Sequence, residues 1–218
     1  MNEITDYKIY NFGADTKDLG AMDNDCFTQN SNTLVVGEQF NISEIKYKKG
    51  DSTSSITTGF TISSSDTSVI DVTSSGLLGK KLIASSKGTA RIKIDYMGTT
   101  KEVTVTVKDE ERRFDSININ ERTVTAYKGE QTIIRVSAVD QYGDPITAKV
   151  LSDADINVDP FENGSVTPLA NGTLGSKGSQ GEVQWKLIPG SVGSGTICFK
   201  NKKGDIIGKI YLNVKERA

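Results

Sequence analysis

From Thr33 onward, apolar and polar residues alternate in short runs separated by turn residues. The clearest case is a pair of runs, 90–94 and 103–107, with a Met-Gly-Thr turn at 97–99 between them. Alternation with a period of two is typical of a strand with one buried face. We therefore predict an antiparallel hairpin in which the valines of the second run lie opposite the apolar residues of the first on one buried face, namely Ala90, Ile92, Ile94, Val103, Val105 and Val107.

The second half of the chain shows the same alternation. Every second residue is apolar in 134–138, 154–158, 183–187 and 210–214. Trp185 occupies an apolar position of the third run, which predicts a core aromatic between two sheets. About seven short strands at such spacing are typical of an antiparallel sandwich.

Five consecutive charged residues at 109–113 separate the two patterned regions. A charged run directly after a strong strand indicates a linker between domains. We therefore expect one sandwich at 33–109 and a second at 110–218. Residues 1–32 fit neither pattern, although 4–9 could form a strand. They are either the tail of a preceding module or an added edge strand of the first sandwich.

The composition supports strands over helices. The chain contains 21 Ile, 16 Val and 22 Thr but only 10 Leu and 10 Ala. Branching at Cβ suits the pleated sheet, whereas helices favour Leu and Ala. The predicted fold class is all-β, with two antiparallel β-sandwiches in tandem.

Composition also removes several classes of function. Histidine is absent and only two cysteines occur, which excludes Ser–His and Cys–His catalytic pairs and sites built from several Cys or His ligands. The net charge of −2 offers no overall basic field for nucleic acid. No apolar run approaches the roughly 18 residues of a membrane helix, and the N-terminus lacks the apolar stretch of a signal peptide. We expect no membrane insertion, no nucleic-acid partner and no enzymatic activity.

Residues 33–108 contain a series of motifs: Ser-Ser-Asp at 64–66 before an apolar strand, a Ser-Gly turn at 75–76, Gly-Thr-Ala at 88–90 and a final valine-rich strand. In the order and spacing of these motifs, the segment resembles the bacterial Ig-like group 2 family. Phe60 and Ile62 stand where the family often has a tryptophan.

Residues 114–218 are similar to a more divergent Ig-like module. The segment 140–146, Asp-Gln-Tyr-Gly-Asp-Pro-Ile, resembles a turn of Ig-like modules in bacterial surface-layer proteins and adhesins, and Gly-Thr-Ile at 195–197 resembles Gly-Thr-Ala at 88–90. The resemblance implies an extracellular structural module pair of a bacterial surface-layer or cell-surface protein. Its partners would be neighbouring modules or copies of the same protein. The alternatives are an adhesin fragment that binds a host or cell-wall glycan, and a phage head or tail protein on a virion.

Two acidic strings are candidate calcium sites. Asp153, Asp155, Asn157 and Asp159 would project from one face of a strand, and grouped oxygen ligands of this kind suit Ca²⁺. The alternative is an ordinary solvated strand face. The N-terminal segment carries a second string that includes Asp23 and Asp25, which could bridge to a neighbouring module through Ca²⁺ or form a solvated loop.

Cys26 and Cys198 fall into different predicted modules. A disulfide would require the N-terminal segment to fold back onto the second sandwich. We expect instead a small hydrophobic residue on a strand at Cys198 and a loop thiol at Cys26.

Overall fold

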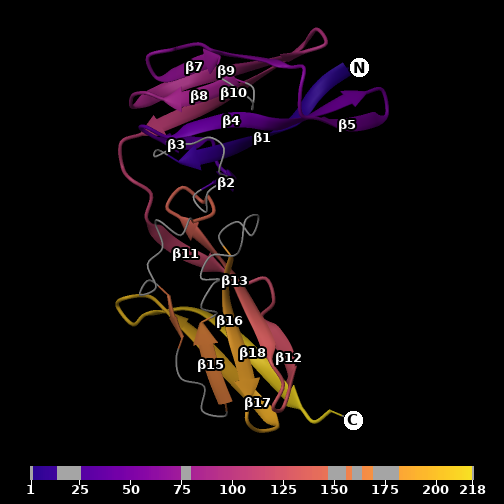
Figure 1. Ribbon diagram of the computed structural model, residues 1–218, viewed down its shortest axis with the longest axis vertical. Coiled ribbons are helices and arrows are strands. Elements are labelled where there is room, and N and C mark those ends of the chain that lie inside the picture. The colour runs from indigo at the N-terminus through magenta and orange to yellow at the C-terminus, as the bar shows by residue number, and fades with distance from the viewer. Residues whose placement is uncertain are drawn as a thin grey trace. The chain divides into compact units, whose positions relative to one another are not determined.

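The computed structural model describes residues 2–13, 26–74, 80–146, 156–158, 164–168 and 182–217. Within these ranges every regular element is a β-strand, so the all-β prediction is confirmed (Figure 1). The chain folds into two units, Met1–Arg112 and Arg113–Ala218, which divide inside the charged run predicted as a linker.

The described part of the first unit is a sandwich of two sheets. One sheet has the order β2–β1–β4–β8–β7 with β5 also beside β4, and consists of β1 (Asn2–Gly13), β2 (Phe27–Thr28), β4 (Gln39–Lys49), β5 (Ser52–Ile56), β7 (Ile70–Ser74) and β8 (Lys80–Ala84). The other has the order β3–β10–β9–β6 and consists of β3 (Thr33–Val35), β6 (Thr61–Ser64), β9 (Gly88–Tyr96) and β10 (Thr99–Lys108). Buried residues of both sheets form one core.

The predicted hairpin is β9–β10. Val103 lies opposite Ile92 and Val105 opposite Ala90, and all four side chains are buried. The turn at 97–98 has positive φ at both residues, the geometry that lets a two-residue turn match the twist of its strands. The sequence pattern thus predicted the hairpin and its buried face, but the predicted register was wrong by two residues. Val107 lies opposite Gly88, and Ile94 lies opposite Lys101.

Strand β1 is part of the first sandwich. It pairs with β4 along most of its length, and its Ile4 and Ile9 belong to the core of the first unit. The sequence left open whether residues 1–32 precede this sandwich or add a strand to it; in the structure, β1 lies between β2 and β4.

The second unit is also a sandwich. One sheet has the order β11–β13–β16–β15 and consists of β11 (Phe114–Asn118), β13 (Thr132–Asp140), β15 (Gly164–Pro168) and β16 (Glu182–Pro189). The other has the order β12–β18–β17–β14 and consists of β12 (Thr123–Tyr127), β14 (Asn157–Val158), β17 (Gly193–Lys200) and β18 (Ile206–Lys215). Trp185 is buried against Phe199, with ring centroids 5.1 Å apart, as predicted for a core aromatic.

The two units share one topology. The order β1–β4–β8–β7 corresponds to β11–β13–β16–β15, and β3–β10–β9–β6 corresponds to β12–β18–β17–β14. In both units an early strand crosses to the second sheet and pairs parallel to the last strand, as β3 does with β10 and β12 with β18. These two parallel pairs are exceptions within otherwise antiparallel sandwiches.

The strand registers correspond as well. Val107 of β10 pairs with Leu34, and Val214 of β18 pairs with Ala126, in each case across the parallel pair. On the other side, the first residues of β9 and β17 pair with the same two valines. Positions along β10 and β18 can therefore be matched residue by residue.

Candidate functional site

The predicted calcium ligands lie mostly outside the described residues. This applies to Asp153, Asp155, Asp159, Asp23 and Asp25. Asn157 is described: it is exposed on β14, opposite Lys200 of β17. Within the described ranges, no three or more acidic or thiol side chains group in a way that could hold a metal ion. Calcium binding stays a prediction.

The first unit contains a cluster of buried polar side chains at its linker end. Asn11 comes from β1, Gln29 follows β2, Glu38 lies in the turn before β4, and Arg112 is the last residue of the unit. We call these four side chains the linker clamp. Burial of polar groups is costly unless they bond to one another, and these four do.

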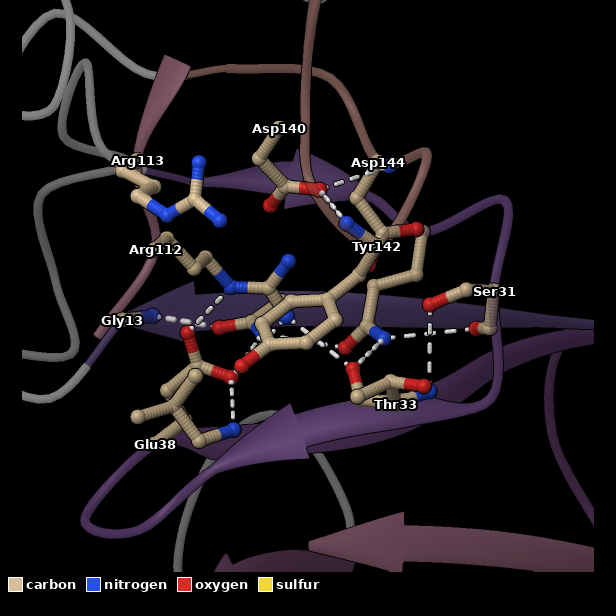
Figure 2. Close-up of polar contacts among 12 residues, drawn as sticks. Gly13, Ser31, Thr33, Glu38, Arg112, Arg113, Asp140, Tyr142 and Asp144 are labelled. Atoms are coloured by element: carbon tan, nitrogen blue, oxygen red, sulfur yellow. Dashed lines mark hydrogen bonds and ion pairs between the residues drawn. The ribbon is translucent and has the colours of Figure 1, made fainter. Parts of the chain in front are cut away.

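Glu38 is the centre of the linker clamp. Its Oε1 lies 2.6 Å from Nε of Arg112, and its Oε2 accepts a second bond of 3.1 Å from the same guanidinium (Figure 2). Oε2 also accepts from the backbone N–H of Val35 and from Nδ2 of Asn11, each at 2.9 Å. A two-pronged guanidinium–carboxylate pair fixes orientation as well as distance.

The other members extend this network. Nδ2 of Asn11 also donates to Oε1 of Gln29 at 2.9 Å, and Nε2 of Gln29 donates to the carbonyl of Thr33 at 2.8 Å. Arg112 donates to the same carbonyl at 3.0 Å, and its guanidinium lies 4.9 Å from the ring centroid of Phe27. The linker clamp therefore joins β1, β3 and the turn before β4 to the residue at which the chain leaves the first unit.

Sequence reasoning missed the linker clamp. Arg112 was interpreted only as part of the charged run that links the domains, and Glu38 was not singled out. The two stand 74 positions apart, so no local pattern connects them. The available signal was Arg112 itself, a long basic side chain shortly after the last strand of a module, from where it can reach back to the fold.

The predicted Asp-x-Tyr-Gly-Asp-Pro turn of the second unit has a clear structural basis. Oδ1 of the buried Asp140 accepts from the backbone N–H groups of Tyr142 and Asp144 at 2.9 and 3.0 Å (Figure 2). Gly143 has φ of 81°, which favours glycine. Short aspartate side chains close turns in this way, so the motif serves the fold.

The Ser-Ser-Asp motif of the first unit is likewise structural. Oδ1 of Asp66 accepts from the hydroxyl and the backbone N–H of Ser68 at 2.6 and 2.9 Å. The bond from the Ser68 hydroxyl is the main cause that holds the pKa of Asp66 below its ordinary value. Ser65 bonds across to Arg91 of β9 through both its hydroxyl and its backbone N–H. The motif fixes the passage from β6 to β7.

Cys26 and Cys198 are not joined by a disulfide, as expected. Cys26 lies beside Tyr10. Burial is the main cause that raises the pKa of the Tyr10 hydroxyl, and the neighbouring Cys26 raises it further. Within the parts of the chain that the structure describes, no helix has the length and apolar character to cross a bilayer.

Comparisons with known proteins point to bacterial surface layers. The chain is 25% identical over 203 residues to S-layer protein EA1 of Bacillus anthracis, which covers 87% of this chain and 21% of that protein. It is 26% identical over 220 residues to an S-layer protein of Bacillus licheniformis, covering 97% of this chain and 24% of that protein. The chain thus spans about a quarter of the length of these relatives or less.

Among solved structures, domains 4 and 5 of the S-layer protein SbsC match 97% of this chain and 98% of theirs, with 21% identity and a TM-score of 0.39. Invasin, a bacterial integrin-binding protein, matches 83% of this chain and 36% of its own, with 12% identity and a TM-score of 0.36. At such scores the description of the fold rests on the strand pairing given above.

No family model matches the chain, so the group 2 assignment of residues 33–109 stays a prediction. The predicted resemblance to bacterial surface-layer proteins is confirmed by the two sequence relatives.

Proposed function

We propose that this chain is a structural module pair of the bacterial cell surface, outside the cell, and that its role in a surface layer is mechanical and non-enzymatic. The observation that carries the proposal is similarity to two S-layer proteins along 87% and 97% of the chain. Its partners are then neighbouring modules or further copies of the same protein.

The fold suits such a role. Each unit encloses its own core between two sheets, so each can keep its shape as a rigid block. The first and last strands of the first unit in sequence, β1 and β10, both contribute core residues. The chain is therefore anchored to the sandwich at its first strand and at its last.

The linker clamp supports the proposal in a second way. A surface lattice needs fixed spacing, and a free linker would let its modules swing. Arg112 is held by Glu38 and by the carbonyl of Thr33, so the chain leaves the first unit from a fixed point. We infer that the clamp limits how far the linker can bend where it leaves that unit.

Immunogold electron microscopy tests the proposal. Antibodies raised against this chain should label the outer surface of intact cells of the source bacterium densely and evenly. Label inside the cells alone would contradict the proposal. Label on phage particles would favour the phage alternative, and binding of the purified chain to host cells would favour the adhesin.

A further inference from the structure

The outer face of the sheet β12–β18–β17 differs from an ordinary solvated surface. Along β18, alternate side chains point outward while Ile210, Leu212 and Val214 are buried. We call this outward surface the tyrosine face, and its exposed residues that matter here are Thr123, Thr196, Lys209, Tyr211, Asn213 and Lys215.

Tyr211 lies at the centre of the tyrosine face. It pairs with Thr196 of β17 on one side and with Thr123 of β12 on the other. Lys209 and Asn213 precede and follow it on the same side of β18. Its side chain is 54% exposed, so a large aromatic ring stands in solvent with hydroxyl, amide and ammonium groups around it.

The tyrosine face carries lysines, and no acidic residue lies on its three strands. Among the outward residues of β12, β17 and β18, all of which the structure describes, there is no Asp or Glu. Lys209 and Lys215 stand at either end of the row on β18, about 20 Å apart at the usual rise per strand residue of roughly 3.4 Å. A second tyrosine, Tyr127, lies opposite Lys215 on β12.

The first unit provides an internal comparison, because its topology is the same. On β10, Glu102 occupies the position of Lys209 and Thr104 that of Tyr211. Two ion pairs lie on that face: Arg91 lies 3.8 Å from Glu102, and Lys93 lies 3.2 Å from Asp95. The lysine at 209 and the exposed ring at 211 are therefore particular to the second unit and are not requirements of the fold, whereas Lys215 has a counterpart in Lys108 of the first unit.

We propose that the tyrosine face binds an anionic polysaccharide. The apolar side of a sugar ring packs on an exposed tyrosine, and its hydroxyls bond to threonine and asparagine. Acidic groups along the polymer pair with Lys209 and Lys215, which a linear chain of sugars can reach together. This is a binding role, distinct from the mechanical role proposed above, and it rests on the second unit alone.

Charge complementarity favours this partner over a second copy of the chain. A copy that met the chain through its own tyrosine face would set lysine against lysine, and on the matching face of the first unit Glu102 and Asp95 are already in ion pairs. A polymer with an acidic group on each sugar offers a regular row of charge.

The test is isothermal titration of the full chain with polygalacturonate at low salt, since exposed ion pairs weaken as salt rises. Dextran supplies a neutral polysaccharide, and polyglutamate supplies the charge without sugar rings. We expect binding to polygalacturonate alone. Tyr211→Thr and Lys209→Glu should each weaken it by about tenfold or more. Both variants install the residue found at the same position of the first unit, so both should fold and melt as the wild-type chain does.

Lys108→Glu is the matched control, because Lys108 occupies the position of Lys215 on the first unit and the charge change equals that of Lys209→Glu. It should bind as the wild-type chain does. No binding, equal binding to polyglutamate or dextran, or an equal loss in the control would overturn the proposal. A chain that does not bind polygalacturonate but forms a concentration-dependent dimer, which Tyr211→Thr abolishes, would also overturn the proposal. That result would show that the tyrosine face contacts a second copy.

Discussion

Glu38 and Arg112 form a buried pair, with side chains 8% and 6% exposed. Arg112→Met would leave the Glu38 carboxylate in place with only the bonds from Val35 and Asn11 to replace hydration. Removal of one partner of a buried pair typically costs about 3–5 kcal/mol. We expect a loss of this order in the free energy of unfolding of the first unit, measured by urea denaturation.

The exposed pair between Lys87 and Asp109, 3.0 Å apart and 64% exposed at both side chains, is the control. Lys87→Met should change the unfolding free energy by about 1 kcal/mol or less. Equal effects of the two substitutions would show that Arg112 contributes no more than a surface charge.

We expect Asp66 to make the first unit sensitive to acid. The hydrogen bond from Ser68 lowers the pKa of Asp66, so the folded state favours the carboxylate. A carboxyl group with a lowered pKa in the folded state stabilises that state at pH values above its unfolded-state pKa. This stabilisation is lost as the pH falls through the folded-state pKa. Near pH 7 the melting temperature of the wild-type chain should thus exceed that of Asp66→Asn. The difference between the two melting temperatures should become smaller toward about pH 2. A gap independent of pH would assign the effect to shape instead of charge.

At the scale of single residues, burial was easier to predict than polar contacts. Trp185 and the alternating valines follow from period two alone, because a strand buries every second side chain. Glu38 and Arg112 could not be paired in advance, since nothing in a turn or a charged run shows which charge the fold will bury.

Among the strands, β9 depends on the glycine at its start. A Cβ at Gly88 would lie 2.8 Å from Cγ2 of Val69, which is buried. Gly88→Ala should therefore destabilise the first unit by about 1–3 kcal/mol, the usual cost of overpacking. Val69→Ala removes the methyl groups that would clash with the new Cβ. Gly88→Ala should therefore reduce the free energy of unfolding by less in a Val69→Ala background than in the wild-type chain. Strictly additive effects in urea denaturation would exclude this contact as the reason for glycine.

The hairpin β9–β10 was predicted, although not its register, because its two strands are close in sequence and alternate strongly. Strand β5 was not, because Ser52–Ile56 is almost entirely polar and exposed, and its place beside β4 comes from the tight turn at 50–51. The parallel pairs β3–β10 and β12–β18 also had no signal, since they join segments distant in the chain.

On the scale of the whole molecule, the two units repeat one topology with little repetition of sequence. The motif resemblance set Gly195 against Gly88, but the strand register places Gly193 at the equivalent position, because Gly88 pairs with Val107 and Gly193 with Val214. Alternation indicated two sandwiches correctly. It could not show that β1 holds in the first unit the place that β11 holds in the second, because strand order depends on contacts across the whole unit.

The boundaries of the units provide the last prediction. Fragments 1–112 and 113–218 should each unfold cooperatively, because each contains a complete sandwich. Fragment 33–112 lacks β1, so it loses Ile4 and Ile9 from the core and leaves β4 with an open edge, which invites aggregation. Circular dichroism melting should show it unfolded or markedly less stable than 1–112.

Fragment 1–109 separates the linker clamp from the sandwich itself. It keeps every strand that the structure describes in the first unit but ends before Arg112, so Glu38 loses its charged partner. It should melt below 1–112 by about 12 °C or more, since loss of one partner of a buried pair costs about 3–5 kcal/mol and a small domain shifts by about 4–8 °C for each kcal/mol. Addition of Glu38→Leu to 1–109 should restore part of the difference, because it removes the unpaired carboxylate. If 1–109 and 1–112 melted together, the first unit would end at β10 and the clamp would add nothing to its stability.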